Sequence, residues 1–300
     1  DGVWTPGSDF LKVSTGYGKA ESADGTTPNG IGGVRAVDAD GNGTVDYVYA
    51  GDLQGNLYRF DMTSTTPSSW VSTPKLLFQA RYKASDSFPR DIIQPITTTP
   101  LVLNHPTEAD DFLVIIGTGS WMTTEDATST DIQSIYGIWD DMSVNPLVEM
   151  TSTTNQLVEQ VFTNHASAEH GFTVRTLTNN TVAWDNQGNA STFVKGWYID
   201  LDVLDAAGTA VEYPGERATR NIQYRGGILF VNTVIPKDTA ACSVGVGGYE
   251  LALDPSNGGS GSAVIFAASA CTSGDAHPET SPPRTNSRNS STPSWITTPG

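Results

Sequence analysis

Short apolar runs separated by turn-forming residues make up most of this chain. Runs of roughly four to eight residues rich in Val, Ile, Leu, Tyr and Phe alternate with clusters of Gly, Asn, Asp, Pro and Thr, which is typical of β-strands and turns. Helical periodicity is almost absent, and a helix is plausible only in short segments such as 155–162. The expected strands are 47–51, 56–60, 75–82, 101–103, 112–117, 135–139, 171–177, 194–201, 227–234 and 248–253. The glycine-rich segments 30–33 and 258–262 are interpreted as turns.

A weak internal repeat follows from these strands. A strand ending in Gly, a connector and a second strand ending in Asp occur in 47–61 (YVYAGDLQGNLYRFD), in 112–140 and in 227–254. Units of about four strands at intervals of roughly 60–80 residues are typical of β-propeller blades. We therefore expect an all-β protein with a modified β-propeller; a β-sandwich is the alternative, and it explains the recurring unit less well.

One domain followed by a tail is expected from the change in composition along the chain. Residues 1–271 would form the propeller domain, and residues 272–300 a Ser/Thr/Pro-rich tail or linker that lacks the apolar area to fold alone. The chain opens in mid-pattern without a visible signal peptide, which favours a piece of a longer protein.

The charge balance narrows the class of partner. The formal net charge is −17, from 33 acidic and 16 basic residues, which argues against nucleic acid and anionic membranes as partners. No apolar run approaches the ~18 residues of a membrane span, so no membrane insertion is expected. Cys242 and Cys271 are the only cysteines; they could form a disulfide in an oxidising compartment or remain two buried thiols.

Residues 38–46 (DADGNGTVD) carry the strongest chemical signal. Oxygen-bearing residues at every second position suit a loop that wraps one hard cation, and the spacing matches positions one, three, five, seven and nine of a calcium loop. The expected ligands are the side chains of Asp38, Asp40, Asn42 and Asp46 and the backbone carbonyl of Thr44. The cofactor expected from this pattern is Ca²⁺.

The loop departs from the helix-loop-helix calcium site at one position. Gly43 occupies position six, where a sharp turn is needed, but position twelve is Tyr49 rather than a bidentate Glu. Asp46 would therefore close the coordination shell. The alternative is a metal-free Gly/Asp/Asn-rich turn, in which the carboxylates would repel one another; magnesium is less suitable because it retains its waters.

The calcium loop and the segment that follows it resemble the C-terminal propeller domain of the PilY family of type IV pilus biogenesis factors and tip adhesins. The resemblance covers roughly residues 10–265 and includes further segments in the same order. These segments are 94–100 (QPITTTP), 116–119 (IGTG), 136–140 (YGIWD), 196–201 (GWYIDL), 215–217 (GER), and Cys242 with 247–248 (GG).

The resemblance implies a propeller in which calcium binding and release control pilus extension and retraction. It implies as partners minor pilins or other type IV pilus components, together with host or abiotic surfaces, and a location at the cell surface or pilus tip after export through the periplasm. The family propeller has about seven blades, whereas this chain has room for four or five, so a partial ring is expected. Asn42 where the family has Asp removes one negative charge and would weaken calcium affinity.

Two other functions stay open at this point. A quinoprotein-like dehydrogenase would need a funnel with a catalytic Asp, an Arg and stacking Trp residues, which the sequence does not assemble. A calcium-stabilised lectin or matrix adhesin is the other alternative. Our expectation is a protein that is not an enzyme, with no catalytic residues.

Other histidines, aspartates and tryptophans are further site candidates. His165 and His170 are interpreted as solvated loop residues rather than zinc ligands, because their spacing is not helical and no third ligand is evident. Asp200, Asp202 and Asp205 are interpreted as a strand end and turn. The tryptophans expected in loops or termini, and hence as contact residues, are Trp4, Trp70, Trp121 and Trp295.

Overall fold

The protein is almost entirely β-structure. The computed structural model describes residues 4–7, 9–18, 28–71, 74–83, 90–150, 155–167, 172–184, 193–204, 211–236 and 247–260. Within these ranges there is one short 3-10 helix, Pro67–Val71 (η2), and no α-helix, which confirms the all-β expectation. None of the described helical structure is long and apolar enough to cross a membrane.

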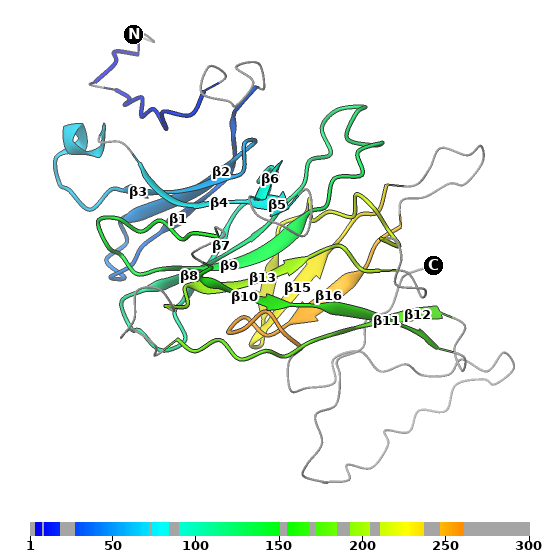
Figure 1. Ribbon diagram of the computed structural model, residues 1–300. Helices are drawn as coiled ribbons and strands as arrows, with labels where there is room; N and C mark the ends of the chain where they lie inside the picture. The colour runs from blue at the N-terminus through cyan, green and yellow to red at the C-terminus, as the bar shows by residue number, and fades with distance from the viewer. Residues whose placement is uncertain are drawn as a thin grey trace, which may run out of the picture.

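The first sheet is a four-stranded antiparallel meander near the N-terminal end of the described chain (Figure 1). Its strands are β1 (Ile31–Val37), β2 (Tyr47–Asp52), β3 (Asn56–Asp61) and β4 (Lys75–Gln79), in that spatial order. The sheet is one repeat unit of the expected kind. The long connection between β1 and β2 carries the predicted calcium loop.

The second sheet has five strands in the order β10-β13-β9-β8-β7. Its strands are β7 (Leu101–Asn104), β8 (Phe112–Gly117), β9 (Ser134–Asp140), β10 (Leu157–Gln160) and β13 (Gly196–Asp200). β10 runs parallel to β13, and the other neighbours are antiparallel.

A three-stranded antiparallel sheet and two ribbons complete the described structure. The sheet consists of β14 (Gln223–Arg225), β15 (Ile228–Asn232) and β16 (Glu250–Leu253). One ribbon pairs β5 (Arg81–Lys83) with β6 (Arg90–Ile93), and the other pairs β11 (Phe162–Ser167) with β12 (Phe172–Leu177).

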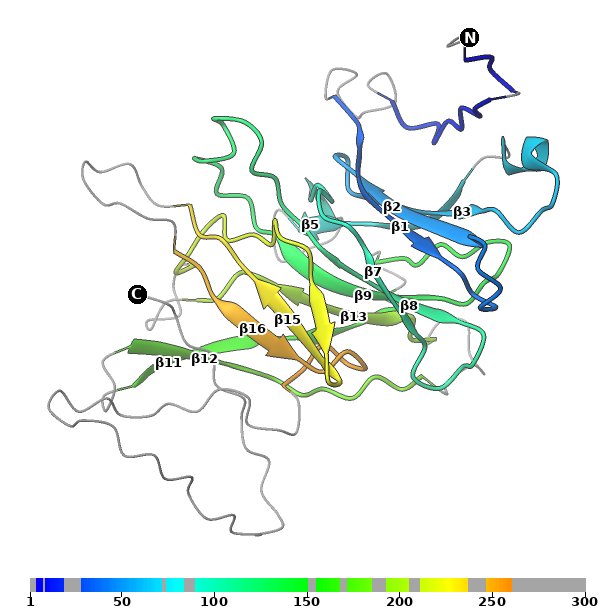
Figure 2. The same cartoon turned by 180° about the vertical axis from the view of Figure 1, so that it is seen from behind.

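The three larger sheets follow one another across the molecule, with the second in the middle (Figures 1 and 2). Every residue of β8 is buried, because its two faces belong to different cores. Val114 and Ile116 pack with Tyr49 and Leu57 of the first sheet. Leu113 and Ile115 belong to the other core cluster, which includes Leu229 and Val231 of the third sheet. The described sheets are stacked like propeller blades but do not close into a ring, in agreement with the expected partial propeller.

One close approach fixes the packing inside the second sheet. Gly137 of β9 lies against the indole of Trp197 in β13, and a Cβ at residue 137 would be only 2.3 Å from Trp197 Cε2. A glycine is therefore required where the two strands meet. The indole is held by a hydrogen bond of 3.0 Å from Nε1 to the carbonyl of Pro255.

The expected helix at 155–162 is wrong. Leu157–Gln160 form strand β10, whose residue Leu157 is in register with Gly196 of β13. Leu157 belongs to the core cluster shared with the first sheet, and its neighbour Val158 packs against the other core cluster, so the two faces of the segment contact different cores. Pairing with an existing sheet outweighs the modest helix propensity of so short a segment.

Two further boundaries differ from expectation. The predicted turn at 30–33 lies largely in β1, where a Cβ at Gly32 would be 2.7 Å from the carbonyl oxygen of Ile96. The glycine allows a close backbone approach rather than a turn. The single strand predicted at 75–82 is divided at the buried residue Ala80, so that β4 joins the first sheet and β5 pairs with β6.

Candidate metal centre

The predicted calcium loop connects β1 to β2 at the end of the first sheet. Asp38 directly follows β1, and the Asp46 backbone N–H donates to the carbonyl of Val37 at 2.9 Å. The Asp46 carbonyl accepts from the Met62 N–H at 2.7 Å. Both hydrogen bonds continue the ladder of the sheet, so the two ends of the loop are anchored while the loop itself is exposed to solvent.

Three carboxylates converge in this loop. One oxygen from each of Asp38, Asp40 and Asp46 can be chosen so that all three lie within 4.8 Å of one another. Asp38 and Asp40 are exposed and Asp46 is half-buried. At this separation each pair of carboxylates repels by roughly 1 to 3 kcal/mol between the limits of water and a protein surface. A divalent cation at the centre would remove this cost.

The loop backbone is organised around Asp38. Its Oδ1 accepts from the backbone N–H groups of Gly41 and Asn42 at 2.8 and 3.1 Å, and its Oδ2 accepts from Gly43 at 2.8 Å. Gly41 and Gly43 have φ of 76° and 87°, which L-residues with a side chain rarely adopt. The two glycines therefore allow the tight curvature that brings the carboxylates together.

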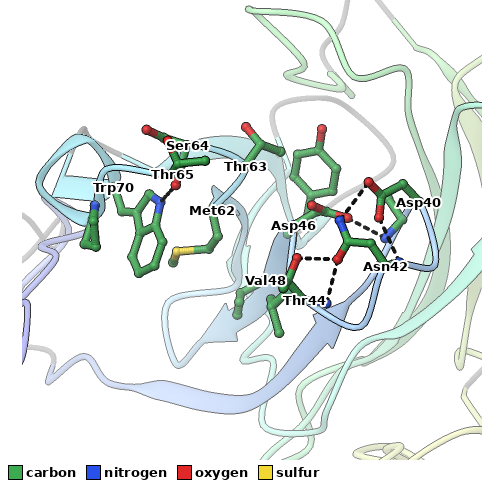
Figure 3. A pocket seen from close by; sticks show the side chains of 14 residues that line it. Asp40, Asn42, Thr44, Asp46, Val48, Met62, Thr63, Ser64, Thr65 and Trp70 are labelled. Atoms are coloured by element: carbon green, nitrogen blue, oxygen red, sulfur yellow. Dashed lines mark hydrogen bonds between the residues drawn. The ribbon is translucent and has the colours of Figure 1, made fainter.

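Asn42 and Thr44 are tied to each other. Asn42 Oδ1 accepts from the backbone N–H of Thr44 at 2.8 Å and from its hydroxyl at 2.5 Å, and Asn42 Nδ2 donates to Asp40 Oδ2 at 2.8 Å (Figure 3). The hydroxyl of Thr44 is thus occupied within the loop. Its backbone carbonyl is the atom that the sequence assigned as a ligand.

The residue at position twelve is excluded as a ligand by its place in the fold. Tyr49 is fully buried, and its hydroxyl donates to Asp140 Oδ2 at 2.8 Å in the second sheet. Burial, followed by the charge of Asp140, raises the pKa of Tyr49 far above its usual value. In a calcium-bound loop, closure of the shell would therefore fall to Asp46, whose Oδ2 accepts from the Ala39 N–H at 2.7 Å.

The donor set fits a calcium ion. It offers three carboxylates, one amide oxygen and one backbone carbonyl, which are hard oxygen ligands without nitrogen or sulfur. Carboxylate groups in a flexible exposed loop also suit the variable geometry of calcium better than the strict octahedron of magnesium. The five predicted residues are all in the loop, and the carboxylates of three of them come together.

Buried polar contacts connect β2 and β3, the strands that follow the loop, to the second sheet. Arg59 of β3 is opposite Tyr49 in the sheet register, and its Nη1 lies 2.5 Å from Asp140 Oδ1 at the end of β9. Both side chains are buried. The strands that carry the loop are therefore fixed to the neighbouring sheet by two interactions with the same carboxylate.

The other candidate residues lie away from this loop. Asp200 ends β13 as expected and accepts from the Ser134 hydroxyl at 2.5 Å, and Asp202 accepts from the Tyr82 hydroxyl at 3.0 Å. His165 is in β11, so its assignment to a loop is wrong. The site candidates that lie outside the described part of the chain are Asp205, His170, Cys242, Cys271 and Trp295, and the expected tail 272–300 also lies outside it.

Two residues that the sequence did not associate with the loop lie close to it in the structure. Trp70 is half-buried in η2, and together with Met62 it faces the loop across a groove (Figure 3). Trp4 and Trp121 are exposed, as expected for contact residues. The pairing of Tyr47 with Asp61 brings the segment after β3 beside the loop, and this long-range register is not readable from local spacing.

Comparisons with known proteins match this chain to one protein family. The family model described as the PilY1 beta-propeller domain matches residues 14–175. The type IV pilus biogenesis factor PilY1 of Pseudomonas aeruginosa is 32% identical over 80% of this chain, and a PilY1 homolog of Xylella fastidiosa is 28% identical over 80%. This chain spans about a fifth of the length of those relatives, 21% and 16% respectively.

A solved structure gives the same match in three dimensions. The crystal structure of the Pseudomonas aeruginosa PilY1 C-terminal domain superposes with a TM-score of 0.60 at 29% sequence identity. The match covers 79% of this chain and 49% of that chain. Sequence and fold therefore point to the same relatives.

Proposed function

The chain belongs to the PilY1 beta-propeller domain family, and on this premise we propose that it is the calcium-binding propeller of a type IV pilus biogenesis factor. The observation that carries the calcium assignment is the convergence of three loop carboxylates within 4.8 Å. The residues that would hold the ion are Asp38, Asp40, Asn42 and Asp46, with the backbone carbonyl of Thr44.

The proposed role of the ion is structural and regulatory. Calcium supplies two positive charges that offset the mutual repulsion of Asp38, Asp40 and Asp46. Without it, the same carboxylates favour an expanded loop, although backbone hydrogen bonds to Asp38 retain part of the turn. Binding and release of the ion would thus change the order of the surface around the loop, while the strands behind it stay anchored through Arg59 and Asp140.

We place this surface in contact with other type IV pilus components. The relatives are named as type IV pilus biogenesis factors, which supports partners within the pilus, such as minor pilins, and a location at the cell surface or pilus tip after export through the periplasm. Attachment to host or abiotic surfaces would be a further role of the same exposed face. Calcium would then regulate pilus extension, retraction and attachment.

The contacts of the buried arginine side chains favour a role without catalysis. A quinoprotein-like active site needs an arginine available to a cofactor. Arg59 is paired with Asp140 and Arg175 with Glu216, while Arg217 donates to backbone carbonyls, including those of Ser120 and Asp126. These three buried arginines have structural partners, whereas Arg35, Arg220 and Arg225 are exposed at the surface; a buried arginine available to a cofactor is not found among the described residues, which supports a binding protein over a dehydrogenase.

The proposal is tested in the bacterium that produces the protein. The chromosomal copy of the gene for the full-length protein would carry Asp46→Ala. The control is Asp61→Ala, because this substitution also removes one negative charge, at a residue that ends β3 outside the loop. We expect that the number of surface pili and the twitching rate stop responding to calcium in the Asp46→Ala strain and still respond in the control strain. An unchanged calcium response in both strains would refute a regulatory role for this loop.

A further inference from the structure

A groove of about 820 Å³ borders the calcium loop (Figure 3). One wall is the loop itself, with Asp40, Thr44 and Asp46, and the other is the connection from β3 to η2. Residues with apolar side chains that line the groove are Val45, Tyr47, Val48, Met62, Pro67 and Trp70. The groove therefore joins an apolar surface to an acidic rim.

The apolar side of the groove is held in place by hydrogen bonds. Trp70 Nε1 donates to the carbonyl of Ser64 at 2.8 Å, which fixes the orientation of the indole. The backbone N–H of Met62 donates a hydrogen bond to the carbonyl of Asp46, so this wall of the groove is directly connected to the loop. A half-buried Trp beside a Met provides a preformed contact for one apolar side chain.

The charge around the groove has one sign. Asp40 and Asp46 line it, and Asp38 lies beside them in the loop. No lysine or arginine is among the described residues that line it. Arg59 lies under the ring of Tyr47, but its charge is compensated by Asp140. Even with a divalent cation bound, three carboxylates leave a net charge of −1, which disfavours an anionic occupant.

We infer that this groove docks a protein segment that places an apolar side chain against Trp70 and Met62 and a neighbouring lysine or arginine beside Asp40 and Asp46. The inference rests on the proposed function only for its link to calcium. The basic side chain and the ion use the same carboxylates, so each lowers the affinity of the other by the same factor. Calcium would then release the segment from the groove, and its removal would favour docking.

The test uses two short peptides that differ in one charge, acetyl-Gly-Leu-Lys-Gly amide and acetyl-Gly-Leu-Glu-Gly amide. Each is titrated into the ¹⁵N-labelled chain in chelator, and the indole N–H signal of Trp70 is followed by NMR, with Trp70→Phe used to assign it. We expect saturable shifts of Trp70 and Met62 with the lysine peptide and roughly five- to tenfold weaker binding of the glutamate peptide, as one exposed charge reversal allows.

Variants separate the groove from other exposed surfaces. Trp70→Ala should abolish the shifts, and Asp40→Asn, which leaves the apolar wall intact, should weaken the lysine peptide several-fold. Trp121→Ala is the matched control, because Trp121 is an exposed tryptophan that does not line the groove. Saturating calcium should weaken the lysine peptide in the parent chain.

The outcomes distinguish this inference from the proposed calcium function. Equal binding of both peptides, shifts at other residues, or binding of a neutral oligosaccharide in place of the peptides would overturn the inference, whatever a calcium titration shows. Stronger peptide binding in calcium would also overturn it. Charge-selective peptide binding in chelator, in a chain that fails to bind calcium, would retain the groove and reject the calcium proposal.

Discussion

At the scale of single residues, His105 illustrates how burial sets the chemistry of a side chain. Its ring stacks on Trp139 at 4.2 Å between centroids and meets Trp184 edge-on at 4.6 Å. Nδ1 accepts from the backbone N–H groups of Thr107 and Glu108 at 3.3 and 3.1 Å. The ring hydrogen is therefore on Nε2, which has no polar partner among the described residues and points into an aromatic environment.

The burial of His105 predicts that the free energy of unfolding depends on pH. Burial, with the charge of Lys195 as the second cause, lowers the pKa of His105 to about 4. Because the unfolded chain binds this proton near pH 6.5, the contribution of the neutral ring is present above that pH and is lost as the pH falls from about 6.5 to about 4. The shift corresponds to at most about 3 kcal/mol.

The variant His105→Asn retains an acceptor for the backbone N–H groups but cannot ionise in this range. We expect the parent chain to exceed the variant in free energy of unfolding at pH 7, and the difference to shrink by pH 4.5. Urea unfolding at both pH values measures it. Parallel pH profiles for the two chains would contradict the assignment of a neutral, buried His105.

The residue scale also shows which parts of the site local sequence can predict. Asp38, Asp40 and Asp46 were predictable because alternating oxygen-bearing residues in one short loop need no distant partner. Trp70 and Met62 were not joined to them, because they reach the groove only through the register of β2 with β3. Spacing along the chain does not encode that register.

At the scale of elements, a buried ion pair connects the β11–β12 ribbon to the segment that packs on the third sheet. Arg175 of β12 contacts both carboxylate oxygens of Glu216 through Nη1, at 2.8 and 2.9 Å. The Thr233 hydroxyl, just after β15, donates to the same carboxylate at 2.6 Å. The guanidinium lies 3.6 Å from the ring centroid of Tyr249. This contact compensates in part for Nε and Nη2, which have no hydrogen-bond partner among the described residues.

We predict that Glu216→Gln lowers the free energy of unfolding by about 3 to 5 kcal/mol, because the charge of Arg175 is left buried without a counter-charge. The single variant Arg175→Met completes the cycle. The double variant Arg175→Met, Glu216→Gln should lose clearly less than the sum of the two single changes, because no unpaired charge remains. Urea unfolding of the four chains gives the coupling. Additive losses would show that the two side chains act independently.

Most strands were predictable from the sequence, whereas their partners were not. The strand β8 has an uninterrupted apolar pattern because it is buried on both faces, and such a run identifies a strand without naming its neighbours. The segment Leu157–Gln160 was misassigned because its strand character depends on parallel pairing with β13. The strand β1 was missed because its glycines serve close contacts with residues 96–99.

At the scale of the whole molecule, the loop 38–46 that we propose as a calcium site is exposed and connects two strands of the first sheet. The first sheet packs on the second through Tyr49, Leu57, Val114 and Ile116, so the loop is attached to a rigid stack rather than to an isolated hairpin. The described sheets do not form a closed ring. The loop and its groove therefore belong to one end of a stacked partial propeller, where the proposed change in the loop would not require the core to unfold.

The central claim is that residues 38–46 hold one calcium ion. The most direct measurement is a calorimetric titration of the metal-stripped chain with calcium, alongside Asp46→Ala and the control Asp61→Ala. The carboxylate of Asp61 accepts from the backbone N–H and the hydroxyl of Thr63 in its own turn, outside the loop. The account predicts one saturable site in the parent and control chains and none in Asp46→Ala. Equal calcium affinity in Asp46→Ala, or no binding to the parent chain at millimolar calcium, would contradict it.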